Sequence, residues 1–172
     1  MMKRWLAALF ILSVLSVAIG IVAFPMDTYD TPLQAMKSEV KKAEYIPAYT
    51  EDNQALFFFR LNDHALGAAY SRKNWSGWRS GMMTWSDEEF ERIEQEHVLN
   101  HQGHGDTLIF GLFHPEDNVE VMLGDATSNV VPIEGNDALA IWYFEREQGF
   151  SDHTLRLVDK QTGTILSERN VY

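Results

Sequence analysis

The sequence Ala55-Leu56-Phe57-Phe58-Phe59-Arg60-Leu61 carries apolar residues at nearly every position. A strand exposed on one face alternates apolar and polar residues, whereas a strand covered on both faces is apolar throughout. This stretch therefore predicts a central strand that is covered on both sides. Asn62-Asp63 is a plausible two-residue turn, and residues 64–72 return with apolar side chains on one face, which predicts a β-hairpin.

Two capping boxes predict two helices next to this hairpin. Thr31-Pro32-Leu33-Gln34 places a Thr N-cap three residues before Gln, with Pro at the first helical position, and predicts a helix over residues 32–43. Ser86-Asp87-Glu88-Glu89 is the second box and predicts a helix over residues 86–100.

The other apolar segments are short and are separated by turn-forming residues. Between the two predicted helices, residues 78–85 predict one more strand after the hairpin. In the last third of the chain the predicted strands are 107–113, 119–123, 129–133, 138–145, 154–158 and 164–168. We therefore expect an α+β fold, in which an N-terminal transmembrane helix precedes one mainly antiparallel sheet domain with two helices.

Residues 5–24, WLAALFILSVLSVAIGIVAF, contain no charged side chain. Twenty helical residues span about 30 Å, the thickness of the hydrocarbon core of a bilayer, which favours a transmembrane helix. The alternative is a cleaved signal peptide, whose apolar region is typically about 7–15 residues long. Lys3 and Arg4 precede the span and acidic residues follow it, so we predict a cytoplasmic N-terminus.

This orientation defines the expected domains and location. Residues 1–24 are a cytoplasmic stub and transmembrane anchor, residues 25–31 are a linker, and residues 32–172 are an extracytoplasmic α+β domain. The protein is then a single-pass protein of the cell membrane that contacts the lipid bilayer through residues 5–24.

Charge and cysteine content restrict the possible partners. The chain has 25 acidic and 14 basic residues, a formal net charge of −11, and no cysteine. Nucleic-acid binding requires a basic surface, so we exclude nucleic acid as a partner. A domain outside the cytoplasm without cysteine folds without disulfides, which is typical of bacterial exported proteins.

A sequence pattern in the C-terminal third of the chain supports the bacterial interpretation. It consists of Ile141-Trp142-Tyr143, Ser151 and the C-terminal Leu155-x-Leu157-x-Asp159-x-x-x-Gly163-x-Ile165, behind the anchor and Gly77-Trp78. The pattern resembles small membrane-anchored or secreted proteins of Bacillus-type Gram-positive bacteria, which are mostly uncharacterised. The resemblance bears on fold and location, and transfers no functional residue.

The densest group of metal-ligand residues is Glu94-x-x-His97-x-x-x-His101-x-x-His104-x-Asp106. Two His at positions i and i+4 of a helix project on the same side, and the two following residues could complete a zinc site. However, Val98 stands where a zinc protease has its catalytic Glu. The alternative is a half-buried His97 on the inner face of the helix, with the other two His near the helix C-terminus.

A second candidate site is the tryptophan-rich segment that contains Trp75, Trp78 and Trp85. Tryptophans on a Gly- and Ser-containing loop can contact a sugar, a peptide or another protein, because indole offers a large apolar area and one donor. The alternative is that they cover the core of a small sheet.

Neither a catalytic motif nor a phosphate-binding loop is present in the sequence. We therefore predict a non-enzymatic, membrane-anchored extracytoplasmic binding, sensory or accessory module, with a membrane protein or a cell-wall polymer as partner. The alternative is a metal-dependent hydrolase of the cell envelope that uses His97, His101 and His104. No cofactor is expected, except zinc in that alternative.

Overall fold

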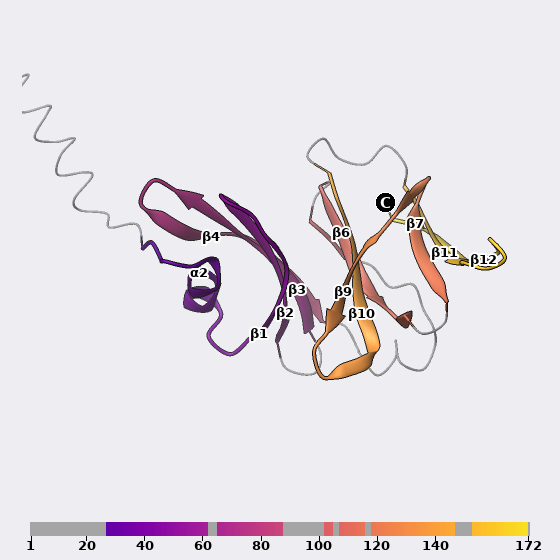
Figure 1. Ribbon diagram of the computed structural model, residues 1–172, viewed down its shortest axis with the longest axis horizontal. Helices are drawn as coiled ribbons and strands as arrows, with labels where there is room; N and C mark the ends of the chain where they lie inside the picture. Colours follow the sequence, from indigo (N-terminus) through magenta and orange to yellow (C-terminus); the bar gives the residue numbers. More distant parts are fainter. Residues whose placement is uncertain are drawn as a thin grey trace, which may run out of the picture.

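The computed structural model describes residues 27–61, 65–87, 102–104, 107–115, 118–146 and 153–171. Within these residues the chain forms one helix and three antiparallel sheets of four strands each (Figure 1). We refer to the sheets as A, B and C in the order in which they follow along the chain.

The bounds of the elements are as follows. The helix is α2 (Pro32–Glu39). Sheet A contains, in spatial order, β1 (Glu44–Thr50), β2 (Gln54–Leu61), β3 (Ala65–Asn74) and β4 (Gly77–Asp87). Sheet B contains β5 (Gln102–His104), β6 (Leu108–Phe113), β10 (Asn136–Glu145) and β9 (Asn129–Ile133). Sheet C contains β12 (Ile165–Asn170), β11 (Thr154–Asp159), β7 (Val119–Leu123) and β8 (Ala126–Thr127).

These elements stack in four layers. Figure 1 shows α2 beside sheet A, sheet B in the middle and sheet C on the far side of sheet B. Three hydrophobic clusters fill the spaces between α2 and sheet A, between sheets A and B, and between sheets B and C. Both inner sheets are therefore covered on their two faces.

Strand β2 shows how the sequence produces this layering. Leu56 and Phe58 pack in the cluster between sheets A and B, whereas Ala55, Phe57 and Phe59 pack in the cluster beneath α2. All five side chains are buried. The prediction of a central strand covered on both faces is confirmed, because successive side chains of a strand point to opposite faces.

Strand β10 has the same arrangement in sheet B. Ile141 and Tyr143 pack toward sheet A, and Trp142 and Phe144 pack toward sheet C. The buried indole N–H of Trp142 donates to the carbonyl oxygen of Leu112 at 3.3 Å, so burial leaves no unpaired donor there.

Helix α2 begins where the capping box predicts and ends earlier. The Thr31 Oγ1 accepts a hydrogen bond from the Gln34 N–H at 3.2 Å, and Pro32 is the first helical residue. The hydroxyl of Tyr45 donates to the carbonyl oxygens of Met36 and Val40 at 2.8 and 3.1 Å. The Tyr45 hydroxyl thus adds a donor to two carbonyls at the C-terminal end of α2, which ends at Glu39.

The predicted α+β class with one sheet and two helices is wrong for the described part of the chain. That part is mostly β-strand, in three sheets, with a single helix of eight residues. Ser86 and Asp87, the start of the second predicted helix, pair with Leu66 and Ala65 as the last residues of β4. The ladder with β3 thus holds Ser86 and Asp87 in extended backbone, and the rest of the second predicted helix, residues 88–100, lies outside the described ranges.

The strand positions agree better with the sequence than the fold class does. The hairpin of β2 and β3, strand β4, and the strands β6, β7, β9, β10, β11 and β12 all lie where apolar segments predicted them. The structure adds β1, β5 and β8, which the sequence pattern did not reveal.

The predicted single-pass membrane protein with a signal anchor, located in the cell membrane, also requires correction. Among the described residues, no helix has the length and apolar character that crossing a bilayer demands. The predicted anchor at residues 5–24 and the predicted cytoplasmic N-terminus lie outside the described ranges.

Gly67 provides a test of the packing beneath α2, because it lies opposite Phe59 in the β2–β3 ladder. A Cβ at this position would overlap the buried Phe59 ring. We expect Gly67→Ala to lower the free energy of unfolding by about 1–3 kcal/mol, measured by urea denaturation, because overpacking strains a dense core. The cost should be smaller in a Phe59→Leu background, which opens space. An equal cost in both backgrounds would show that the ring is not the cause.

Candidate functional site

A partly open pocket of about 950 Å³ lies between sheets A and B. Its lining comes from β2, β3 and β4 on one side and from β9 and β10 on the other, together with residues near the end of β1. The polar and aromatic side chains that define it are Tyr49, Gln54, Tyr70, Asn129, Tyr143 and Glu145. The pocket is the place where the apolar core between the two sheets becomes polar.

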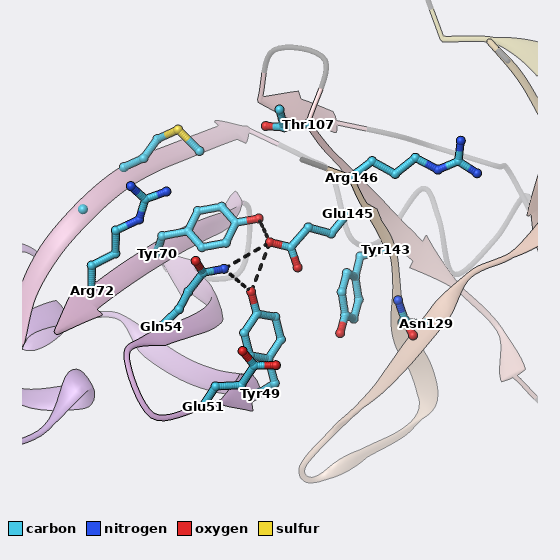
Figure 2. A pocket seen from close by; sticks show the side chains of 12 residues that line it. Tyr49, Glu51, Gln54, Tyr70, Arg72, Thr107, Asn129, Tyr143, Glu145 and Arg146 are labelled. Carbon is cyan, nitrogen blue, oxygen red and sulfur yellow. Dashed lines mark hydrogen bonds between the residues drawn. The ribbon is translucent and has the colours of Figure 1, made fainter. Parts of the chain in front are cut away.

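The carboxylate of Glu145 is the centre of the pocket's hydrogen bonds (Figure 2). Its Oε1 accepts from the Tyr70 hydroxyl at 2.6 Å, from the Tyr49 hydroxyl at 3.0 Å and from the Gln54 amide at 3.5 Å. The same amide donates to the Tyr49 hydroxyl at 2.6 Å. Three side chains of sheet A thus hold one carboxylate oxygen of sheet B, and no hydrogen bond joins Oε2 to a described residue.

A β-bulge turns Tyr49 into the pocket. The β1–β2 register runs from Pro47 opposite Phe57 directly to Tyr49 opposite Leu56, which leaves Ala48 as the extra residue. Cross-strand partners lie on the same face, and Leu56 faces sheet B. Without the bulge, Tyr49 would point toward α2, so the bulge re-aims its hydroxyl at Glu145.

A second irregularity lies beside Tyr70. The β3–β4 register shifts between Ala69 and Ser71, so that Gly81 and Met82 together oppose Tyr70. A Cβ on Gly81 would lie 2.9 Å from the carbonyl oxygen of Tyr70, closer than a side chain tolerates. Glycine therefore permits the close approach of β4 at the pocket wall.

The three tyrosines of the pocket are held in their protonated form. Burial raises the pKa of the Tyr70 hydroxyl well above its ordinary value, and the hydrogen bond to the Glu145 carboxylate raises it further. Burial likewise raises the pKa of Tyr49, partly opposed by the hydrogen bond from Gln54. Burial and the negative charge of Glu145 raise the pKa of Tyr143. At neutral pH the pocket therefore presents neutral hydroxyls around one carboxylate.

Charged side chains of both signs complete the lining. Arg72 and Glu51 are exposed, and Arg72 lies beside Tyr70 in Figure 2. Arg146 follows Glu145 in the chain, and in Figure 2 its side chain extends in the opposite direction. Glu145 is half-buried, so its charge lies deeper in the protein than that of Arg72.

The structure places the three predicted tryptophans in different environments. Trp75 lies in the turn between β3 and β4 and is 95% exposed, and Trp85 is 57% exposed near the other end of β4. Trp78 is only 6% exposed, because it packs in the cluster beneath α2 and pairs with Tyr29 through two backbone hydrogen bonds. The three indoles do not form one surface, and contact through Trp75 or Trp85 stays a prediction.

The predicted metal site falls largely outside the described residues. His97, His101 and Asp106 are outside them, and His104 is described only as the last residue of β5. In the ranges that the structure describes, no three His, Asp or Glu side chains are grouped so that they could hold a metal ion. Zinc binding and the hydrolase alternative stay predictions.

Sequence reasoning missed the pocket residues altogether. Tyr49, Gln54 and Tyr70 are 96, 91 and 75 positions from Glu145, so no local spacing connects them. The one sequence signal that could have indicated the pocket is an acidic residue at the end of an otherwise apolar strand. Glu145 follows Ile141 and Tyr143 on the same face of β10 and thereby marks where the core meets solvent.

Comparison with protein families, curated proteins and solved structures gives no match for this chain. The resemblance to Bacillus-type proteins stays a prediction.

The raised pKa values of Tyr49, Tyr70 and Tyr143 predict a late tyrosinate titration. These hydroxyls have a higher pKa in the folded than in the unfolded chain, so they contribute stability below an unfolded pKa of about 10. That contribution is lost as the pH rises toward the folded pKa values. In an absorbance titration we expect these tyrosines to ionise late, together with alkaline unfolding.

The matched control for this titration is Tyr70→Phe. It should remove one late-titrating group and weaken the dependence of the unfolding free energy on alkaline pH. The assignment is contradicted if the pocket tyrosines ionise near pH 10 while the protein remains folded.

Proposed function

We propose that this protein is a non-enzymatic binding module whose ligand site is the pocket between sheets A and B. The observation that supports this most directly is the state of Glu145. One oxygen of its carboxylate is supplied with three donors, and the other oxygen receives none from the described residues. Small-molecule sites are concave and contain a few fixed polar groups that can bond to the ligand. Glu145 is such a group, because its second oxygen can still accept a hydrogen bond.

Pre-organisation favours binding over chemistry. Tyr70 is buried and Tyr49 half-buried, and the hydroxyls of both donate to Glu145, so ligand binding does not have to order these two side chains. Among the described residues that line the pocket there is no histidine, serine or cysteine. Thr107 lines it, and the described lining residues provide no histidine that could act as its base.

Blocking the pocket tests this function. Asn129 lines the pocket next to Tyr143 in the β9–β10 ladder, and the adjacent Val130 is 50% exposed and is not part of the lining. A panel of amines, carboxylates and sugars is screened by thermal shift, and hits are measured by calorimetry. We expect at least one ligand that binds the parent and Val130→Trp with equal affinity, and Asn129→Trp about tenfold more weakly or worse.

One outcome would contradict the pocket as the ligand site. A ligand that Asn129→Trp still binds at full affinity lies elsewhere on the protein. Circular dichroism and the melting temperature of both tryptophan variants verify that the fold is retained, since both substitutions are made on the same strand.

A second function is favoured by the exposure of Trp75. Its turn is ordered, because the Asn74 Oδ1 accepts hydrogen bonds from the Ser76 N–H and hydroxyl at 2.9 and 2.8 Å. An exposed indole on an ordered turn is a suitable anchor for a protein partner or a cell-wall polymer.

Crosslinking tests this contact. A photoreactive residue at position 75 should capture a defined protein or glycan in intact cells, and one at Lys160, in the turn between β11 and β12, should not. Equal capture from both positions would indicate only random collisions and would remove Trp75 as a contact residue.

A further inference from the structure

We infer that the ligand of the pocket is an organic ammonium ion, a small molecule with a protonated amino group, and that the carboxylate of Glu145 is its counter-charge. The inference rests on the proposed function, because it names the ligand class of the same site. Four features of the pocket support it: the uncompensated charge of Glu145, its second carboxylate oxygen, the aromatic lining, and the positions of the nearby arginines.

The first feature is the charge of Glu145. Half-buried carboxylates in proteins are normally compensated by an arginine or lysine, because partial desolvation of a charge is costly. Within the described residues, the carboxylate–guanidinium pairs Arg60–Glu44 and Arg156–Glu168 are made by other side chains. The partners of Glu145 there are two neutral hydroxyls and one neutral amide, so its negative charge remains for a ligand.

The second feature is the direction of the hydrogen bonds. All three donors converge on Oε1, and Figure 2 shows the second oxygen of Glu145 without a dashed line. An ammonium group can donate to this oxygen and form a charge-assisted hydrogen bond, which is about twice as strong as a neutral one. A neutral hydroxyl can donate as well, but it leaves the charge uncompensated.

The third feature is the aromatic lining. Tyr49, Tyr70 and Tyr143 line the same pocket as Glu145, and their hydroxyls stay protonated at neutral pH. Tyrosine rings attract cations through their faces, and the hydroxyl oxygens can accept from a second N–H. Aromatic rings around one carboxylate favour a cation with an attached apolar body.

The fourth feature is the placement of the positive charges. Arg72 is exposed, so solvent and salt screen its repulsion of a bound cation more than they screen the attraction of the half-buried Glu145. The side chain of Arg146 extends away from the carboxylate in Figure 2. Glu51 adds a negative charge at the rim, and the net charge of −11 raises the local concentration of cations.

The experiment compares three probes of similar shape by calorimetry with the full chain. Phenethylamine, 2-phenylethanol and 3-phenylpropionate share a phenyl ring on a short alkyl chain and end in an ammonium, a hydroxyl and a carboxylate. Spermidine is added as a polyamine. We expect the amines to bind at least about tenfold more tightly than the alcohol, and the carboxylate not to bind.

Three variants test the assignment of Glu145 as the counter-charge. Glu145→Gln keeps an acceptor for the tyrosines and removes the charge, and should weaken amine binding by about tenfold or more. Arg72→Gln removes a positive charge from the same pocket, and should strengthen amine binding a few-fold, because it removes a screened repulsion of the bound cation. Glu145→Asp keeps the charge and should retain part of the affinity, which provides a second reading if Glu145→Gln is unstable.

The possible outcomes separate this inference from the proposed function. If the alcohol or the carboxylate binds as well as the amine, and Asn129→Trp blocks that binding, the pocket function stands and the ammonium assignment is wrong. If the amines bind but Glu145→Gln does not weaken them, the assignment of the counter-charge is overturned. If neither these probes nor the broader panel binds, both proposals are rejected.

Discussion

The burial of sheet B on both faces is the constraint on which the remaining structure depends. Every residue of β6 is buried, and the two faces of β10 contribute to separate cores. A shift of β10 by one residue would exchange these two sets of side chains and point Trp142 toward sheet A. The register of the central sheet is therefore strongly specified, and the position of every side chain along β10 follows from it.

That register also places the polar group of the pocket. Tyr143 and Glu145 follow Ile141 on the face that points to sheet A, so the strand that anchors the core delivers a carboxylate at the core's edge. Sheet A responds with residues from three strands. Tyr49 reaches the carboxylate only through the bulge at Ala48, and Tyr70 lies beside a second irregularity at Gly81. Two bulges in sheet A, one beside Tyr49 and one beside Tyr70, fit a site that needs side chains re-aimed rather than a regular sandwich.

The sequence predicted the parts of the fold that depend on local periodicity. The uninterrupted apolar run of β2 indicated burial on two faces, and the turn residues separated most strands correctly. It did not reveal β1, because Pro47 interrupts the segment and proline is tolerated only at sheet edges or bulges. Strand β1 is indeed an edge strand with its bulge next to Pro47. The predicted helix start at Ser86 and Asp87 is wrong, because these two residues pair with β3 as the end of β4.

The site itself could not be predicted from local patterns, since its members meet only when sheets A and B pack together. The tryptophan segment around Trp75 and the histidine cluster could be predicted as candidate sites because their residues lie close together in the sequence. Glu145 has no such neighbours, and the sequence does not distinguish it from the other acidic residues, 25 in all. What distinguishes Glu145 is its three-dimensional environment: a strand register fixed by two cores, and three donors from another sheet.

The hydrogen bonds from Tyr49, Gln54 and Tyr70 to Glu145 also join sheet A to sheet B. A neutral acceptor, such as a glutamine oxygen, would satisfy the same donors at a lower desolvation cost. Joining the two sheets by hydrogen bonds therefore does not require a carboxylate. Hydrogen bonds would join the sheets most firmly if they engaged both carboxylate oxygens and excluded water. Here the bonds converge on Oε1 alone, and Glu145 lines a pocket of about 950 Å³. A carboxyl side chain at this position and the one-sided bonding are both explained when the second oxygen binds a positively charged ligand.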